Sequence, residues 1–193
     1  CSHLRKMRIH AHRGAFDWPE NMMTAFRKGV ELGADDIELD LQVSAGSLDE
    51  QAKLKADLVV AHDAYMKNEC RLNQRPLPNQ VFYRNMSVNQ IKRFDCGTFV
   101  NKGFPAPGEK ISTLAEVLHE LRDMRTQKGQ LVGFNIEIKY NPTQPQFYPP
   151  RKEYVKLLLG ILDASRIDRS RLLVQSFDVE ILKEVRQQLR ELR

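Results

Sequence analysis

The chain has 193 residues, 41% hydrophobic and 28% charged, which is enough apolar material for one sizeable core and predicts a single domain over residues 1–193. Its 30 basic and 25 acidic residues give a formal net charge of +5, and because both signs are mixed along the chain we expect no nucleic-acid-binding surface. No apolar run approaches the roughly 18 residues of a transmembrane helix, so the sequence predicts a soluble protein, cytoplasmic or periplasmic, and leaves its oligomeric state open.

The three cysteines are Cys1, Cys70 and Cys96. They are too few and too widely spaced for a disulfide framework or a CxxC metal site, so we expect free thiols. Because the chain begins with Cys1 and not with methionine, we expect a fragment or a processed product.

Short apolar segments alternate with helical patterns along the chain, which is typical of repeated βα units around a mainly parallel sheet or barrel. The five predicted strands cover residues 7–12, 36–42, 58–62, 134–139 and 172–177.

The helical segments carry recognisable start and stop signals. The first is predicted over residues 21–32, where Gly33 ends it. Ser87 and Thr113 each begin a capping box, and Asp178 is a good N-cap for the last helix.

The second predicted strand alternates strictly between polar and apolar residues. Glu38 and Asp40 therefore point to one face, and Ile37, Leu39 and Leu41 to the other. If the apolar face packs on helices, the two carboxylates face the barrel interior, where a cation or strong donors must compensate them. An edge strand with a wet acidic face would give the same pattern.

The fourth predicted strand repeats this signal and places Asn135, Glu137 and Lys139 on one face. Carboxylates from two strands offer the hard oxygen ligands that Mg²⁺ or Ca²⁺ prefers. Lys139 beside them is suited to a phosphate group; a surface ion pair with Glu137 is the alternative, which the repeated alternation disfavours.

Two histidines stand where an apolar strand gives way to a polar loop: His12 after the first strand and His62 after the third. In βα barrels the carboxyl-terminal rim of the strands carries the catalytic groups. A pair of imidazoles can act as acid and base at neutral pH. A single histidine at a strand end would more often be structural.

An ordered set of short motifs spans nearly the whole chain and resembles the glycerophosphodiester phosphodiesterase family. The motifs are His12-Arg13-Gly14, Pro19-Glu20-Asn21, Glu38-Leu39-Asp40, His62-Asp63, Asn135-Ile136-Glu137-Ile138-Lys139 and Gln175-Ser176-Phe177-Asp178. Met22 departs from this pattern, because the family commonly has threonine there.

The resemblance implies a TIM-type (β/α) barrel that hydrolyses a small-molecule glycerophosphodiester. A complete barrel has about 250 residues and eight strands, so we expect this chain to be truncated after about five βα units, without its C-terminal units. The implied site residues are Glu38, Asp40 and Glu137 on one divalent cation, Mg²⁺ or Ca²⁺, His12 and His62 as acid and base, Arg13 and Lys139 on the phosphate, and Glu20 and Phe177 at the substrate pocket.

Two alternatives use the same residues. One is a related phospholipase D-like sphingomyelinase barrel, which the absence of a membrane-seeking apolar stretch disfavours. The other is an inactive barrel fragment or binding module, because an open five-stranded sheet exposes an edge.

Overall fold

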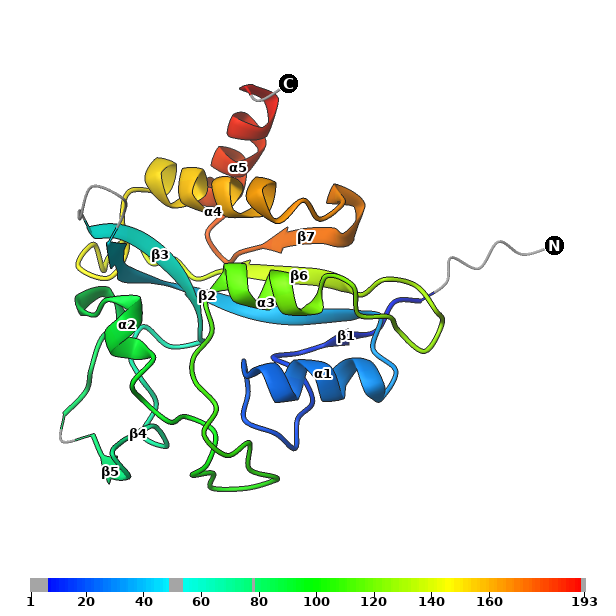
Figure 1. The fold of residues 1–193 in the computed structure, drawn as a ribbon. Coiled ribbons are helices and arrows are strands. Elements are labelled where there is room, and N and C mark those ends of the chain that lie inside the picture. The colour runs from blue at the N-terminus through cyan, green and yellow to red at the C-terminus, as the bar shows by residue number, and fades with distance from the viewer. Residues whose placement is uncertain (1–6, 49–53, 78, 192–193) are drawn as a thin grey trace.

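The computed structural model describes residues 7–48, 54–77 and 79–191, and a five-stranded sheet forms its centre (Figure 1). Four strands are parallel, in the order β1-β2-β6-β7, and β3 pairs with β2. The strands are β1 (His10–Ala11), β2 (Asp36–Leu48), β3 (Leu54–Val60), β6 (Gly133–Ile138) and β7 (Leu172–Gln175). All five predicted strands are therefore present, with shifted ends.

Helices cover the apolar face of this sheet. Alternate residues of β2 and β6 join side chains of the helices in one core, in which Ile37, Leu39 and Ile136 are fully buried. The helices are α1 (Met23–Glu31), α3 (Leu114–Leu121), α4 (Arg151–Ser165) and α5 (Val179–Glu191). Within the described part of the chain, no helix has both the length and the apolarity that a membrane crossing requires.

The predicted helix signals are confirmed. Gly33 follows α1 with φ of +111°, and Thr113 and Glu116 form a complete capping box at the start of α3. Asp178 accepts a hydrogen bond from the backbone N–H of Ile181 at 2.7 Å. These local signals could be read from the sequence because each involves residues within one helical turn.

The third strand differs from the parallel unit expected. β3 runs antiparallel to β2, with Leu41 opposite Val60 and Ser44 opposite Asp57. β2 ends at Leu48 and β3 begins at Leu54, which leaves too few residues for a crossover helix, so only a hairpin-like return is possible. β2 is consequently parallel to its neighbours in its first half and antiparallel to β3 in its second.

Residues 61–113 leave the sheet after β3 and return at α3, and we call them the excursion. They lie at the lower left of Figure 1 and include β4 (Arg71–Leu72), β5 (Arg75–Pro76), η1 (Tyr83–Asn85) and α2 (Val88–Ile91). A second core of buried side chains holds the excursion together and includes Met22, from just before α1. Its apolar environment accounts for a methionine at position 22.

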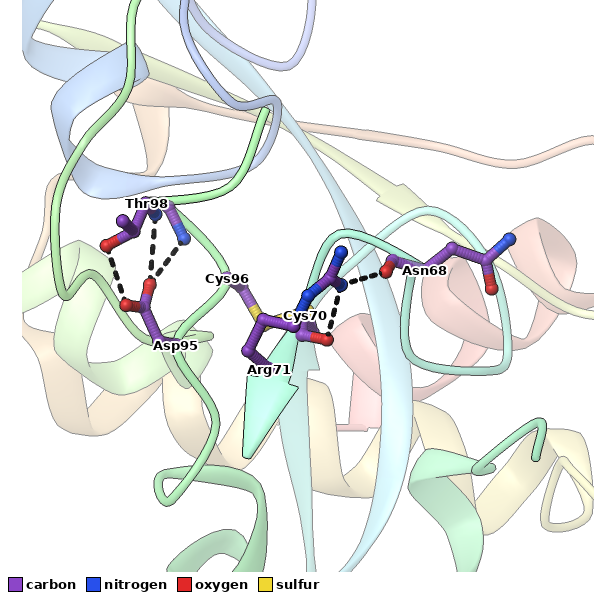
Figure 2. Close-up of a disulfide and its surroundings, with 7 residues drawn as sticks. Asn68, Cys70, Arg71, Asp95, Cys96 and Thr98 are labelled. Carbon is purple, nitrogen blue, oxygen red and sulfur yellow. Dashed lines mark hydrogen bonds between the residues drawn. A yellow bond between two sulfur atoms is a disulfide. The ribbon is translucent and has the colours of Figure 1, made fainter. Parts of the chain in front are cut away.

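The prediction of free thiols at Cys70 and Cys96 is wrong, because these two residues form a disulfide (Figure 2). Backbone hydrogen bonds between Arg71 and Asp95 pair the two segments beside it. The Asp95 carboxylate in turn accepts bonds from the N–H and the hydroxyl of Thr98. The partners are 26 residues apart, so spacing alone could not reveal the pair. Cys1 lies outside the described residues.

We expect the double substitution of Cys70 and Cys96 by serine to destabilise the excursion. A bridge across 26 residues restricts the unfolded chain, and for a loop of this length the loss is roughly 3 kcal/mol. Denaturant unfolding followed by circular dichroism measures it. Dithiothreitol should destabilise the parent protein equally and leave the double variant unchanged; equal sensitivity of both would contradict the bridge.

The start of α1 is held by a carboxylate from far along the chain. Met22, at the N-cap position, offers no side-chain acceptor, and Glu109 Oε1 instead accepts from the backbone N–H of Thr24 at 2.8 Å. Burial raises the pKa of Glu109, and its hydrogen bonds with Thr24 and Met23 offset only part of this rise. The end of the excursion therefore fixes the start of α1.

An ion pair between α4 and α5 predicts a pH dependence of stability. Arg151 donates two hydrogen bonds of 2.8 Å to Asp178, and they lower the pKa of this carboxyl group. The stabilisation is present above the ordinary pKa of about 3.9 and fades as the pH falls through the lower folded value.

Asp178→Asn should therefore cost about 1–2 kcal/mol at pH 7 and little at pH 2, measured by urea unfolding. Glu180→Gln, which removes an exposed pair with Lys183, is the matched control and should change stability little at either pH. A pH-independent loss in Asp178→Asn would mean that charge plays no part.

Candidate active site

Three carboxylates meet on the face of the sheet opposite the helices. The parallel register of β2 and β6 places Asp40 beside Glu137 and Glu38 beside Asn135. Because neighbours in register point to the same side, the alternation in two separate strands builds one cluster. Glu38, Asp40 and Glu137 each offer an oxygen, and these atoms lie within 4.8 Å of one another.

All three carboxylates are buried, with Asp40 fully so. Burial raises the pKa of Glu38, and the negative charges of Asp40 and Glu137 add to this effect. Charges this close and this far from water destabilise one another unless cations balance them. The cluster is therefore a place where positive charge is favoured.

Two cationic side chains reach the cluster. The Lys139 ammonium lies 2.6 Å from Glu137 Oε1 and 3.0 Å from Asp40 Oδ1. Burial lowers the pKa of Lys139, but its hydrogen bond to Glu137 and its ion pair with Asp40 outweigh this and the net shift is upward. Arg13 Nε lies 3.1 Å from Asp40 Oδ2. Three negative and two positive side chains leave the cluster with one net negative charge.

This cluster can hold a divalent metal ion. Besides three converging carboxylate oxygens, Asn135 Oδ1 is buried without a hydrogen-bond partner, although the register sets it level with Glu38. Asp40 Oδ1 likewise has no hydrogen bond and only the ion pair with Lys139. Hard oxygen donors of this kind suit Mg²⁺ or Ca²⁺. One divalent ion would reverse the net charge to +1, which attracts an anion.

The first predicted histidine lies in the loop directly after β1. His10 and Ala11 are in register with Asp36 and Ile37, so the next residue, His12, continues toward the level of Glu38. Its imidazole is exposed to solvent and close enough to act electrostatically on Glu38, whose pKa it lowers. The loop is held by the backbone N–H of Arg13, which donates to Glu38 Oε2 at 2.9 Å.

The second predicted histidine reaches the same edge from the opposite direction. His62 follows β3, which is antiparallel, so it does not lie at the carboxyl end of a parallel strand as expected. Its backbone carbonyl accepts from Gln42 Nε2 at 2.7 Å, and its Nδ1 lies 3.0 Å from Asp63 Oδ1. An ionised carboxylate only accepts, so it favours the tautomer with the proton on Nδ1 and a free Nε2.

Glu20 and Phe177 lie nearer the rim. Glu20 accepts from Arg13 Nη1 at 3.1 Å and pairs with Lys67 of the excursion. Burial raises its pKa, but the two cations outweigh that effect and the net shift is downward. Phe177 is 92% exposed, and its ring lies 6.0 Å from the Lys139 ammonium.

Several residues that support these groups had no role predicted from the sequence. Asn21 has φ of +60° and donates to Asp40 Oδ2 at 2.9 Å, and Gln175 donates to Glu38 Oε1 at 3.2 Å. Both belong to the motifs Pro19-Glu20-Asn21 and Gln175-Ser176-Phe177-Asp178, which were the available signal. Asp63 and Gln42 hold His62, and their pairing depends on the hairpin of β2 and β3.

The parallel strands, the covering helices and the site at the carboxyl edge are those of a TIM-type (β/α) barrel. The model of the glycerophosphoryl diester phosphodiesterase family matches residues 12–193, and the chain belongs to this family. The sequence is 32% identical over 182 residues to a glycerophosphodiester phosphodiesterase of Caldanaerobacter subterraneus, covering 94% of this chain and 62% of that protein. It is 60% identical over 133 residues to the uncharacterized protein YqiK of Bacillus subtilis, covering 68% of this chain and 45% of that protein.

Among solved structures, the fold resembles that of a phosphodiesterase of Oleispira antarctica in complex with the product sn-glycerol-3-phosphate. The TM-score is 0.67 at 20% identity, and the match covers 94% of this chain and 62% of that one. Nearly the whole of this chain is matched in both comparisons, and it spans about three fifths of the length of each of these two proteins.

Proposed function

We propose that this protein hydrolyses glycerophosphodiesters to an alcohol and glycerol 3-phosphate. The observation that carries the proposal is the convergence of Glu38, Asp40 and Glu137 beside Arg13 and Lys139. The family membership and the product named for the Oleispira antarctica structure agree with it.

A phosphodiester carries a negative charge that repels nucleophiles, so the site must neutralise it. Lys139 and Arg13 already bear full positive charges at the cluster. A bound Mg²⁺ or Ca²⁺ would be held by Glu38, Asp40 and Glu137 and would stabilise the charge that develops on the phosphoryl oxygens. The two side chains would then release part of their contact with carboxylates and turn to the substrate.

The proposed reaction uses the neighbouring hydroxyl of the glycerol as nucleophile. Such intramolecular groups reach effective molarities of roughly 10⁵–10⁸ M. His62 takes the hydroxyl proton, the new O–P bond forms, and the bond to the alcohol breaks as His12 protonates the departing oxygen. Water then opens the cyclic phosphate with the two roles reversed, which yields glycerol 3-phosphate.

The free Nε2 favoured by Asp63 supports His62 as the base, because a nitrogen without a proton can accept one. The solvent exposure of His12 supports its role as the acid, since an exposed imidazole can recover its proton from water.

The test is a coupled assay for glycerol 3-phosphate with protein freed of metal by a chelator. We expect no turnover until Mg²⁺ or Ca²⁺ is added, no phosphate release from glycerol 3-phosphate, and no cleavage of sphingomyelin. Full turnover in the presence of the chelator, or release of ceramide phosphate from sphingomyelin, would overturn the proposal.

A further inference from the structure

A cavity beside the proposed reaction centre has a wall of aromatic rings. It measures about 570 Å³ and opens next to His62 and Lys139. Volumes of this size accommodate small ligands. The aromatic lining residues are Tyr65, Phe82, Tyr140, Phe147 and Tyr148.

Two segments far apart in the sequence build this wall. Phe82 comes from the excursion and Phe147 from the loop after β6, and their rings stack with centroids 4.6 Å apart. Tyr65 meets Phe82 edge-on at 6.2 Å. All three side chains are partly exposed, so ring surface remains free for a ligand. The stack joins the two segments, so the wall forms only when both are in place.

The part of the cavity away from Lys139 suits a cation. Among the described lining residues, Asp63 is the one carboxylate, and Lys139, the one lysine or arginine, lies at the end where the phosphate would bind. The other polar lining groups are mainly uncharged amides. Aromatic faces with a carboxylate nearby attract quaternary ammonium groups, which cannot donate hydrogen bonds and so lose little on leaving water.

A second cavity of about 420 Å³ shares Asp63 and Tyr65 with the first but differs in character. Its lining includes Glu20, Lys67 and Asn101. These charged and neutral side chains can donate and accept hydrogen bonds, which suits the two hydroxyl groups of a diol. The two cavities thus offer different surroundings to the two halves of a phosphodiester.

We propose that the aromatic cavity binds the departing alcohol and selects one that carries a quaternary ammonium group. This inference rests on the proposed hydrolysis, because it takes Lys139 as the end of the cavity where the phosphate lies. Since His62 lines this cavity and His12 does not, an alcohol bound there takes its proton from His62, so the inference reverses the two histidine roles proposed for the first step. Phe82 and Phe147 are then the residues that determine specificity.

The experiment compares kcat/KM for glycerophosphocholine and for glycerophosphoglycerol, whose departing alcohol is neutral. We expect a preference for the choline diester of about 5- to 30-fold, the size of a desolvated cation–aromatic interaction. Phe82→Leu and Phe147→Leu should each reduce this ratio about fivefold or more. Phe82→Tyr should retain it. Phe104→Leu, at an exposed ring that contacts Trp18 outside the cavity, is the matched control and should leave the ratio unchanged.

Binding of choline chloride, followed by tyrosine fluorescence in the parent protein and in Phe82→Leu, separates this inference from the proposed function. Equal kcat/KM for both diesters would overturn the inference and leave the hydrolysis standing. Choline binding that is lost in Phe82→Leu, without hydrolysis of any diester, would support the cavity's ligand and overturn the hydrolysis. Absence of both binding and hydrolysis would overturn both.

Discussion

Replacing Asp40 by asparagine should lower kcat/KM for a glycerophosphodiester by roughly 10³-fold, the scale of stabilisation that a catalytic cation provides. Asp40 is fully buried between Lys139 and Arg13, so its charge is felt throughout the cluster. The change also removes the buried ion pairs of Asp40 with Lys139 and Arg13, so urea unfolding of the metal-free variant is measured beside its activity. Isothermal titration with Mg²⁺ or Ca²⁺ should show weaker binding.

Asp36→Asn is the matched control for this change. Asp36 is a buried carboxylate on the same face of β2, four residues before Asp40. It accepts two hydrogen bonds from Arg8. We expect this variant to lose stability and keep its turnover. If both variants lost turnover to the same extent, the metal-binding role of Asp40 would be excluded.

Replacing His62 or His12 by alanine should reduce turnover by about 10²- to 10⁴-fold, the usual contribution of a general acid or base. Both residues lie in loops after strands, and neither side chain belongs to the hydrophobic cores, so the variants should fold. His10→Ala is the control, because His10 lies on β1 beside Asp36, at the level below the carboxylate cluster.

A diester with a nitrophenol leaving group distinguishes the two roles. This alcohol departs without being protonated, so in a single turnover followed by nitrophenol release, His12→Ala should react at nearly the parent rate while His62→Ala remains slow. Recovery in His62→Ala instead would exchange the two assignments, and recovery in neither would contradict the role of His12 as the acid.

The carboxylate cluster could be predicted from the sequence because it depends on short-range periodicity. A strand alternates its faces every two residues, so Glu38 and Asp40 on one strand and Glu137 on another had to share the polar side once both strands lay in one sheet. The same alternation buries Ile37 and Leu39 in the core on the opposite side of the sheet.

Other features depend on which segments meet, and no local pattern contains that information. The disulfide joins Cys70 to Cys96 across the excursion, and the stack of Phe82 on Phe147 joins two segments 65 positions apart in the numbering. The direction of β3 follows from the observed strand ends, because only five residues separate Leu48 from Leu54 and a parallel crossover needs about a dozen or more.

The contact between Glu109 and the start of α1 bears on how this protein can be re-engineered. An engineer could consider replacing the excursion by a shorter loop. This replacement would remove the acceptor for the Thr24 amide and the apolar side chains that bury Met22. Both losses affect the segment that carries Glu20 and Asn21, which contact Arg13 and Asp40. A shorter loop would therefore have to supply another hydrogen-bond acceptor for the start of α1, or the site beside it would be disturbed.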